Sequence, residues 1–352
     1  MTSPLRPEIS GLAEYTLTQH PHRIKLNQNE NPYELPEGIK REILERLAVQ
    51  QWSRYPAFVP SEQIRLLAAF TGWNGEGILI GNGSNELLQL IFSAVLGHGT
   101  SMVISQPSFT LYKILGKAFG ADVREVQMKP DLTFDVPRLI DEARASHAKL
   151  IVLCSPNNPT GTFLPRAELR RVIDETEALV VLDEAYVHFG PESQIDLLGK
   201  CGRLIILQTF SKAMGAAGLR LGYGLMAPEL AKELNKLKLP YNVNIFTLTA
   251  LEVLLARWDE IKGWIEPLKR ERARLHAGLQ AMKGIRVYPS AANFLLFESL
   301  ERLPRQVFSR LLEKGILIRD VSSYPMLARA LRVSVGTPEE NGEFLAAMQE
   351  AL

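Results

Sequence analysis

The sequence has few cysteines, almost no net charge and no long hydrophobic run. Its 352 residues include only Cys154 and Cys201, so no disulfide framework is indicated and a reducing, cytoplasmic compartment is expected. Forty Lys and Arg against 39 Asp and Glu leave a formal net charge of +1, which predicts no bias toward nucleic acid or an anionic membrane. No apolar run approaches the length of a membrane span, and residues 1–7 lack the basic and apolar parts of a signal peptide.

Hydrophobic residues make up 46% of the chain, which is ample for a core, and 352 residues are enough for two domains. Short runs, most of them apolar almost throughout, predict strands at 77–80, 101–104, 122–126, 150–153, 179–182 and 204–207. Helices are expected between them, including 37–51 and 61–71, with Ser61 as a cap for the second. Such strands are typical of an open, mostly parallel sheet that helices cover on both faces.

The pattern changes after Tyr223. Helices are predicted at 228–238 and 246–284, with a break near Pro267, and further helices at 304–314 and 338–352. Strands are predicted at 285–288, 293–297, 316–319 and 331–335. We therefore expect an α/β protein with an N-terminal arm at 1–35 that joins the small domain, a large domain at 36–240, and a smaller α/β domain at 241–352.

The stretch 208–223 is the feature around which the remaining motifs are organised. Lys212 follows the apolar run 204–207, in a loop rich in small residues, with Ser211 beside it and Arg220 eight residues on. A lysine amine can form a Schiff base with a carbonyl, while a hydroxyl and a guanidinium suit a small anion. Pyridoxal phosphate carries both an aldehyde and an anionic phosphate, and in proteins it is bound by a lysine and by an acid that pairs with its ring nitrogen.

Asp183 and Tyr186 follow the apolar run 179–182, where polar side chains at the carboxyl ends of parallel strands gather around ligands. A carboxylate at this place is able to pair with a protonated ring nitrogen. Glu184 is the competing carboxylate, and we favour Asp183. The other interpretation of Asp183 is a helix N-cap, which is common in α/β loops.

Three further segments add polar or aromatic groups. The loop 155–161 holds two prolines and two asparagines, so it is a tightly specified turn that presents the Asn158 amide, and one of its X-Pro bonds is a candidate for cis. Ser84 and Asn85 begin a predicted helix, where free N–H groups bind phosphate, although Ser84 alone is also a simple cap. Phe109 is placed to stack on a flat cofactor or to belong to the core. No metal site is indicated.

The order of these motifs resembles the fold-type I pyridoxal-phosphate enzymes, the aspartate aminotransferase superfamily. The likeness runs from Gly81 to Gly222 and continues at Gly336, so it covers most of the chain. It implies that Lys212 binds the cofactor and shuttles the proton, that Asp183 pairs with the ring nitrogen, and that Phe109 stacks on the ring. It assigns the ring oxygen to Asn158 and Tyr186, and the phosphate to Ser84, Asn85, Ser211 and Arg220.

Within that superfamily the chain is most similar to the histidinol-phosphate aminotransferases. The segment 26–33, which contains Asn29, resembles their N-terminal Asn-Glu-Asn-Pro signature, and Arg319 and Arg332 stand thirteen residues apart, as the substrate arginines of that family do. Two guanidiniums are suited to grip a phosphate dianion. The resemblance also implies that Tyr15 helps to close the substrate site and that Tyr55 reaches the cofactor phosphate of a neighbouring subunit, which requires a homodimer.

The expected reaction is transamination between histidinol phosphate and 2-oxoglutarate, a step of histidine biosynthesis that yields imidazole-acetol phosphate and glutamate. Two enzymes of the same fold stay open as alternatives, a threonine-phosphate decarboxylase and an aromatic amino acid aminotransferase. A non-enzymatic regulator that senses a ligand is a third, but such proteins carry a DNA-binding module, and only about thirty residues precede the Asn-Glu-Asn-Pro segment.

Overall fold

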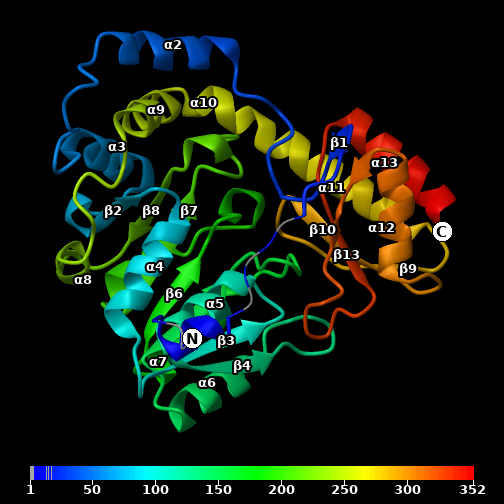
Figure 1. Cartoon of the computed structure of the whole chain (residues 1–352), viewed down its shortest axis with the longest axis horizontal. Coiled ribbons are helices and arrows are strands. Elements are labelled where there is room, and N and C mark those ends of the chain that lie inside the picture. Colours follow the sequence, from blue (N-terminus) through cyan, green and yellow to red (C-terminus); the bar gives the residue numbers. More distant parts are fainter. Residues whose placement is uncertain (1–3, 13, 15, 17) are drawn as a thin grey trace.

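The computed structural model describes residues 4–12, 14, 16 and 18–352. A seven-stranded sheet forms its larger part (Figure 1), in the order β2-β8-β7-β6-β5-β3-β4. Neighbouring strands from β7 to β4 run parallel, whereas β8 is antiparallel to both β7 and β2. The bounds are β2 Ile78–Gly81, β3 Ser101–Gln106, β4 Asp122–Gln127, β5 Leu150–Cys154, β6 Leu179–Asp183, β7 Leu204–Thr209 and β8 Gly222–Leu225.

Helices cover both faces of this sheet because alternate strand residues point to opposite sides. Ile78 and Ile80 share one core with α3, α6, α7 and α9, while Leu79 lies in the core that α4, α5 and α8 cover. Most strands are buried on both faces, which explains why their sequences are apolar throughout. The helix bounds are α3 Ser61–Thr71, α4 Ser84–Val95, α5 Thr110–Ala118, α6 Val136–Ala145, α7 Arg166–Glu175, α8 Pro228–Asn235 and α9 Ile245–Ala256.

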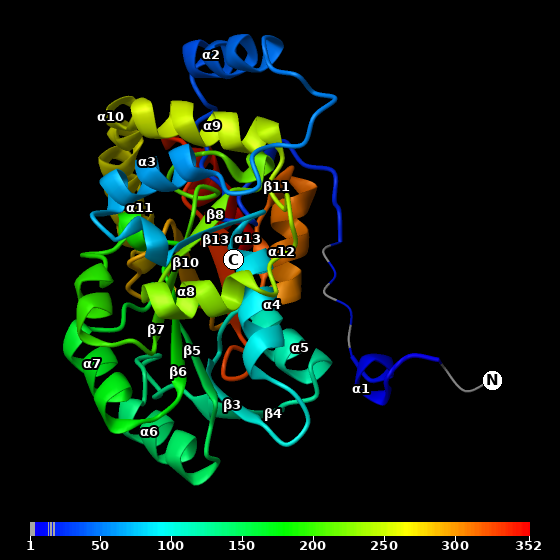
Figure 2. The same cartoon turned by 90° about the vertical axis from the view of Figure 1, so that its left-hand side faces the viewer.

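A smaller unit lies beside the large sheet (Figures 1 and 2). Its antiparallel sheet has the order β12-β13-β10-β9, and α11, α12 and α13 pack on it around a separate core. The short strand β1 (Ile24–Lys25), near the N-terminus, pairs with β11 (Ile316–Leu317) of this unit. The other bounds are β9 Ile285–Val287, β10 Phe294–Ser299, β12 Arg319–Asp320, β13 Ala330–Ser334, α11 Ile265–Gln280, α12 Pro304–Glu313 and α13 Pro338–Ala351.

The structure corrects three local predictions. Strand β8 was not expected, because its glycine-rich sequence around Tyr223 lacks the apolar run of the other strands. Ser61 does not cap α3, since Pro60 is the N-cap and the Ser61 hydroxyl donates to the Val59 carbonyl. The break in 246–284 lies between α9 and α11, around the short helix α10 (Trp258–Ile261), and Pro267 sits in the first turn of α11, where its missing N–H costs nothing.

The domain division at residues 35 and 240 stays a prediction. Helix α9, just after the second boundary, packs on α2 (Glu37–Ala48) and α3 and contributes Leu251 and Leu254 to the core of the large sheet. Helix α11 then runs on to the smaller unit (Figure 1). Within the described part of the chain, no helix is both long and apolar enough to cross a membrane.

Candidate functional site

A cavity of about 230 Å³ lies at the carboxyl ends of the central strands, between the large sheet and the smaller unit. Twelve of the fourteen residues predicted for the site line it, although they come from segments up to 303 residues apart. The exceptions are Tyr15, which lies outside the described residues, and Tyr55. The twelve are Asn29, Ser84, Asn85, Phe109, Asn158, Asp183, Tyr186, Ser211, Lys212, Arg220, Arg319 and Arg332.

Lys212 lies in the loop after β7, and its amine projects into the cavity. Its Nζ donates to the carbonyl of Gln28 at 2.9 Å and lies 5.8 Å from the centre of the Tyr186 ring. Burial, and after it the positive charge of Arg332, lowers the pKa of Lys212 to about 8. An amine with such a pKa is partly neutral at physiological pH, which is the form that attacks a carbonyl.

Asp183 ends β6 and is the acid on the floor of the cavity. The Tyr112 hydroxyl donates to its Oδ2 at 2.6 Å, and the backbone N–H of Ala185 donates to its Oδ1 at 3.0 Å. Burial raises the pKa of Asp183, while these donors act in the opposite direction. A buried acid held this way is suited to pair with a cation brought by a ligand.

Glu184, the competing carboxylate, does not line the cavity. It accepts hydrogen bonds from the Ser193 hydroxyl, the Gln194 backbone and the Gln208 amide, at 2.7 to 2.8 Å. Burial raises the pKa of Glu184 to about 7. Its side chain therefore connects β6 to β7 and to the loop around residue 193, and of the two carboxylates only Asp183 lines the cavity.

An anion cup forms at the other end of the cavity, where the N-terminus of α4 meets Ser211 and Arg220. Arg220 Nη1 lies 3.4 Å from Ser211 Oγ, and the first residues of α4 leave their N–H groups directed outward. Gly83 has φ +81°, and a Cβ on it would lie 2.6 Å from Arg220 Nη2. A Cβ on Gly222 would lie 2.4 Å from the Ser84 nitrogen, so both glycines are needed for this close approach.

These features fit pyridoxal phosphate. The cup offers hydroxyl, guanidinium and helix N–H donors, which suit a phosphate, and the floor offers a buried acid for a ring nitrogen. Lys212 lies in the same cavity, and Phe109 in its wall has the flat side chain that a ring stacks on. Each chemical group of the cofactor thus has a matching group in this donor set.

Asn158 and Tyr186 lie between the acid and the arginines. The Asn158 loop is fixed by two cis bonds, Ser155–Pro156 and Asn158–Pro159, so the expectation of a cis proline here is met. The Tyr186 hydroxyl accepts from Asn29 Nδ2 at 3.0 Å, and Asn29 itself is buried with φ +55°. Asn29 is held by Ser334 as well, so the N-terminal segment locks the Tyr186 ring in place.

Arg319 and Arg332 are directly opposite each other on the antiparallel strands β12 and β13. Arg332 is buried and donates to Asn158 Oδ1 at 2.5 Å and to the Asn27 carbonyl at 2.6 Å. The Arg319 guanidinium has no hydrogen bond or ion pair with any residue that the structure describes. Like charges directly opposite on a sheet repel, so this arrangement suits an anion between them.

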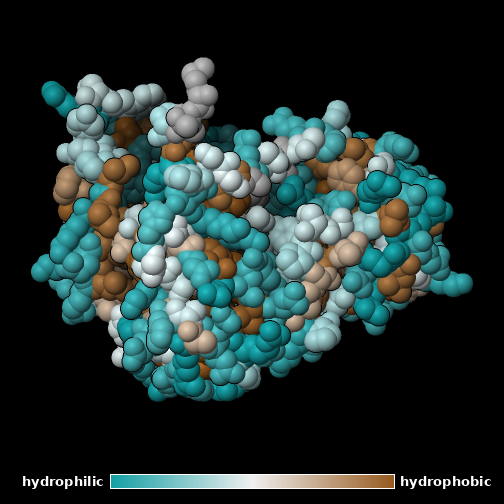
Figure 3. All heavy atoms as spheres, turned by 60° about the horizontal axis from the view of Figure 1, so that its bottom comes forward, coloured by the Kyte–Doolittle hydropathy of each residue, from teal (hydrophilic) through white to brown (hydrophobic). Residues whose placement is uncertain are grey.

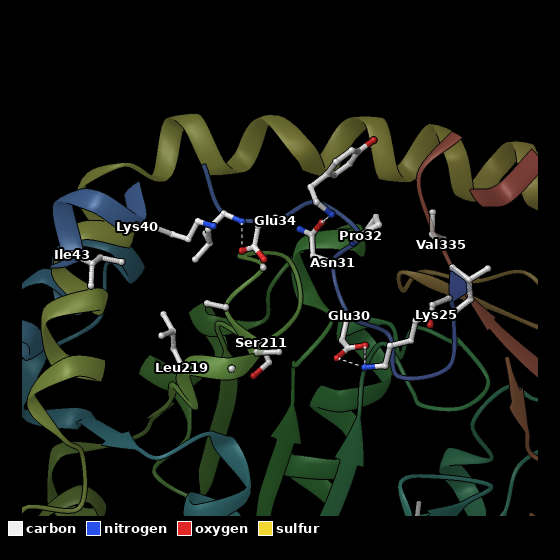
Figure 4. Close-up of a pocket in the computed structure, with 18 of the residues that line it drawn as sticks. Lys25, Glu30, Asn31, Pro32, Glu34, Lys40, Ile43, Ser211, Leu219 and Val335 are labelled. Carbon is white, nitrogen blue, oxygen red and sulfur yellow. Dashed lines mark hydrogen bonds and ion pairs between the residues drawn. The ribbon is translucent and has the colours of Figure 1, made fainter. Parts of the chain in front are cut away.

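Tyr55 lies away from the cavity. It is 80% exposed, and its ring stacks on Tyr241 with centroids 4.6 Å apart. A larger cavity of about 590 Å³ lies on the other side of the lysine loop, where Lys25 pairs with Glu30 (Figure 4). Lys212 does not line that cavity, so the smaller one is the candidate site.

Seven more residues line the cavity that the sequence analysis did not assign to the site: Asn27, Gln28, Tyr112, Cys154, Ala185, Thr209 and Tyr324. In the sequence, Tyr112 is an ordinary residue of an amphipathic helix, Tyr324 belongs to a turn and Thr209 ends a strand. Asn27 and Gln28 contribute their backbone carbonyls, which accept from Arg332 and Lys212. Phe109 and Tyr112 are three residues apart at one helix N-terminus, and this spacing is the one sequence signal that points to Tyr112.

The face shown in Figure 3 is predominantly hydrophilic, and its hydrophobic side chains occur singly or in small groups. Among the described residues, ten of the fourteen exposed large apolar side chains lie in two segments, 44–59 and 237–246. These are Leu44, Val49, Trp52, Tyr55, Phe58, Val59, Leu237, Leu239, Tyr241 and Phe246.

Comparison with known proteins places this geometry in context. Residues 21–348 match the family model described as aminotransferase class I and II. The chain is 38% identical to the histidinol-phosphate aminotransferase of Chlorobaculum tepidum, over 93% of this chain and 94% of that protein. It is 37% identical to that of Desulfitobacterium hafniense, over 99% of this chain and 97% of that protein.

Solved structures share the fold. The histidinol-phosphate aminotransferase of Sinorhizobium meliloti, solved in complex with pyridoxal 5'-phosphate, superposes with a TM-score of 0.89 at 24% identity, covering 100% of this chain and 98% of that one. Aspartate aminotransferase of Thermus thermophilus, a mutant form, gives 0.82 at 21% identity, with both chains covered completely.

Proposed function

The chain belongs to the aminotransferase class I and II family, and we propose that within it the chain is a histidinol-phosphate aminotransferase. It transfers an amino group between histidinol phosphate and 2-oxoglutarate, giving imidazole-acetol phosphate and glutamate, and so serves histidine biosynthesis. Its relatives at 36–38% identity carry that name over nearly their full length, and the fold is that of the fold-type I enzymes. The cofactor is pyridoxal 5'-phosphate.

The cofactor supplies a carbonyl that condenses with amines and a ring that withdraws electrons from the neighbouring carbon. In this proposal Ser84, Asn85, Ser211 and Arg220 hold its phosphate, and Phe109 stacks on its ring. Asp183 holds the proton on the ring nitrogen, while Asn158 and Tyr186 bind the ring oxygen. The support is that all of these side chains line one cavity with Lys212.

Lys212 Nζ is the group that moves the proton. A base must be neutral before it takes a proton from the substrate carbon, and the pKa of about 8 keeps a useful neutral fraction near pH 7. Gln28 and Tyr186 border the amine, and a substrate that displaces the Gln28 carbonyl would leave the amine facing the substrate carbon.

The observation that carries the choice of substrate is the pair Arg319 and Arg332. The two guanidiniums, which face each other across β12 and β13, carry two positive charges, whereas a single carboxylate carries only one negative charge. Arg332 is prearranged by Asn158 and Asn27, whereas Arg319 keeps its donors for a ligand. A phosphate dianion matches both in charge and in its number of acceptor oxygens, and Asn29 borders the same space.

The same proposal includes a homodimer. The two exposed apolar segments that contain Tyr55 and Tyr241 form a surface that a second copy would cover. Tyr55 lies outside its own cavity, which is compatible with a role in the neighbouring subunit. A cytoplasmic location is also proposed, and the two cysteines, both free, are consistent with it.

A coupled assay tests the substrate. Purified enzyme with pyridoxal phosphate is offered histidinol phosphate, phenylalanine or threonine phosphate, each with 2-oxoglutarate, and glutamate and carbon dioxide are measured. We expect glutamate to form fastest with histidinol phosphate. Release of carbon dioxide from threonine phosphate without glutamate would favour the decarboxylase, and preference for phenylalanine would favour the aromatic enzyme.

Co-expression of two inactive variants tests the role of Tyr55. In a mixed dimer of Tyr55→Phe and Lys212→Ala, one site has an intact lysine from one chain and an intact Tyr55 from the other. Activity well above that of either variant alone is therefore expected if Tyr55 acts across the interface. If Tyr55 acts in its own chain, no mixed dimer holds an intact site and mixing restores nothing.

A further inference from the structure

Tyr112 is the side chain that holds the acid at the floor of the cavity. It lies in the first turn of α5, is fully buried, and its hydroxyl donates to Asp183 Oδ2 at 2.6 Å. Cys154, the register partner of Asp183 on β5, is buried on the same floor. The Ala185 backbone N–H donates to the other carboxylate oxygen, Asp183 Oδ1. Among the described residues, Tyr112 is thus the one side-chain donor to Asp183.

A carboxylate in such surroundings tends to take up a proton. Burial disfavours its charged form and raises its pKa, while the positive charge of Lys212 acts in the opposite direction. A hydrogen bond donated to the charged form works against protonation and is worth more than one between neutral groups. The 2.6 Å separation is typical of an O–H group that donates to a carboxylate.

We propose that Tyr112 is a positioning residue that holds Asp183 as a carboxylate, turned toward the ring nitrogen of the bound cofactor. This inference rests on the proposed function, in which Asp183 faces that nitrogen. Phe109, at the entrance of α5, meets the Tyr112 ring edge to face with centroids 5.5 Å apart, so one helix N-terminus supplies both the wall and the floor of the ring site.

The chain offers a matched control. Tyr223 on β8 is also buried, and its hydroxyl donates to Gln208 Oε1, likewise at 2.6 Å. Replacing either tyrosine by phenylalanine removes one buried hydrogen bond of the same length and leaves the ring. Only Tyr112→Phe removes a donor from Asp183, because Gln208 bonds to Glu184 instead.

The test measures cofactor binding rather than turnover. Cofactor-free wild type, Tyr112→Phe and Tyr223→Phe are titrated with pyridoxal 5'-phosphate between pH 5.5 and 8.5, with melting temperature recorded in parallel. At pH 7.5 we expect Kd to rise roughly 10- to 100-fold in Tyr112→Phe and less than about 3-fold in Tyr223→Phe, the first being the loss of a hydrogen bond to a charged group. Both variants should lose some thermal stability, so a lower melting temperature alone does not distinguish the two roles.

The pH dependence has a definite sign. Loss of the donor raises the pKa of the empty Asp183, so a proton must leave it on cofactor binding over a wider pH range. As the pH is lowered, Kd should therefore begin to rise about one pH unit earlier, at a higher pH, in Tyr112→Phe than in wild type or Tyr223→Phe. A rise that begins at an unshifted pH, or equal changes of Kd in the two variants, would mean a purely structural role and overturn the inference.

A second background keeps the inference testable even if Tyr112→Phe is unstable for other reasons. In Asp183→Asn, which has no carboxylate to hold, adding Tyr112→Phe should change Kd less than about 2-fold, whereas independent effects would multiply. Failure of the wild type to bind the cofactor would refute both proposals. Wild type that binds the cofactor but does not turn over histidinol phosphate would refute the proposed substrate alone, since Kd still decides the role of Tyr112.

Discussion

Replacing Arg319 by glutamine should weaken substrate binding without weakening the protein. The Arg319 guanidinium has no partner among the described residues and lies directly opposite Arg332 on the neighbouring strand. Loss of one of two facing like charges relieves roughly 0.2–1 kcal/mol of repulsion, so the melting temperature of the cofactor-free variant should stay constant or rise slightly. Most substitutions at a partly buried site have the opposite effect.

The substitution should weaken binding of the substrate that carries a phosphate ester. A hydrogen bond to a charged group contributes about 1.5–3 kcal/mol, so Arg319→Gln should raise KM for histidinol phosphate roughly 10- to 100-fold. KM for glutamate should change less than about 3-fold, because Arg332 and its partners Asn158 and Asn27 stay in place. With pyridoxal phosphate filling the anion cup, added inorganic phosphate should raise the melting temperature of the wild type and leave that of the variant nearly unchanged.

Arg286→Gln is the matched control. Arg286 lies on β9 of the same small sheet, but it is exposed and pairs with Glu298 at 3.3 Å, outside the cavity. Because exposed ion pairs contribute little, this variant should resemble the wild type in both KM values and in stability. An unchanged KM for histidinol phosphate in Arg319→Gln, or an equal rise for both substrates, would refute the assignment of Arg319 to the phosphate.

Three further predictions address the amine, the anion cup and the contact between the two units. The pKa of Lys212 is about 8 in the native protein and 10.5 in the unfolded chain, so between these pH values the unfolded chain binds more protons. As the pH rises from 7 to 10, the unfolding free energy of the cofactor-free wild type should therefore increase by roughly 3 kcal/mol relative to that of Lys212→Met. The same pH dependence of the unfolding free energy in both proteins, measured by urea denaturation, would contradict this. Gly83→Ala, which places a Cβ against Arg220, should raise the Kd of pyridoxal phosphate at least about 10-fold in an absorbance titration, and a tight-binding variant would show that the cup can adjust. The Thr110 hydroxyl donates to the Tyr324 hydroxyl at 2.8 Å across the two units, so Thr110→Val and Tyr324→Phe should each cost about 0.5–1.5 kcal/mol of stability and the double variant no more than either, additive losses being the contrary result.

The sequence alone determined where six of the seven strands of the large sheet lie along the chain, and the chemical identity of most site residues. Runs such as 150–153 and 179–182 can bury both faces only inside a sheet covered by helices, and the structure confirms strands there. Asp183 and Lys212 stood out because each comes at or just after the end of an apolar strand, and polar residues at strand ends meet at one edge. Arg220 stood out because it is eight residues after Lys212. Local patterns therefore sufficed for groups whose place depends on their own strand.

The tertiary structure decided what depends on distant neighbours. No local pattern distinguishes Asp183 from Glu184, yet Asp183, the last residue of β6, lines the cavity, whereas Glu184, the residue after it, bonds to Gln208. Tyr112 gains its role only because α5 lies beside the end of β6. The register that sets Arg319 against Arg332 follows from pairing β12 with β13, because a shift of one residue would turn every side chain to the opposite face of the sheet.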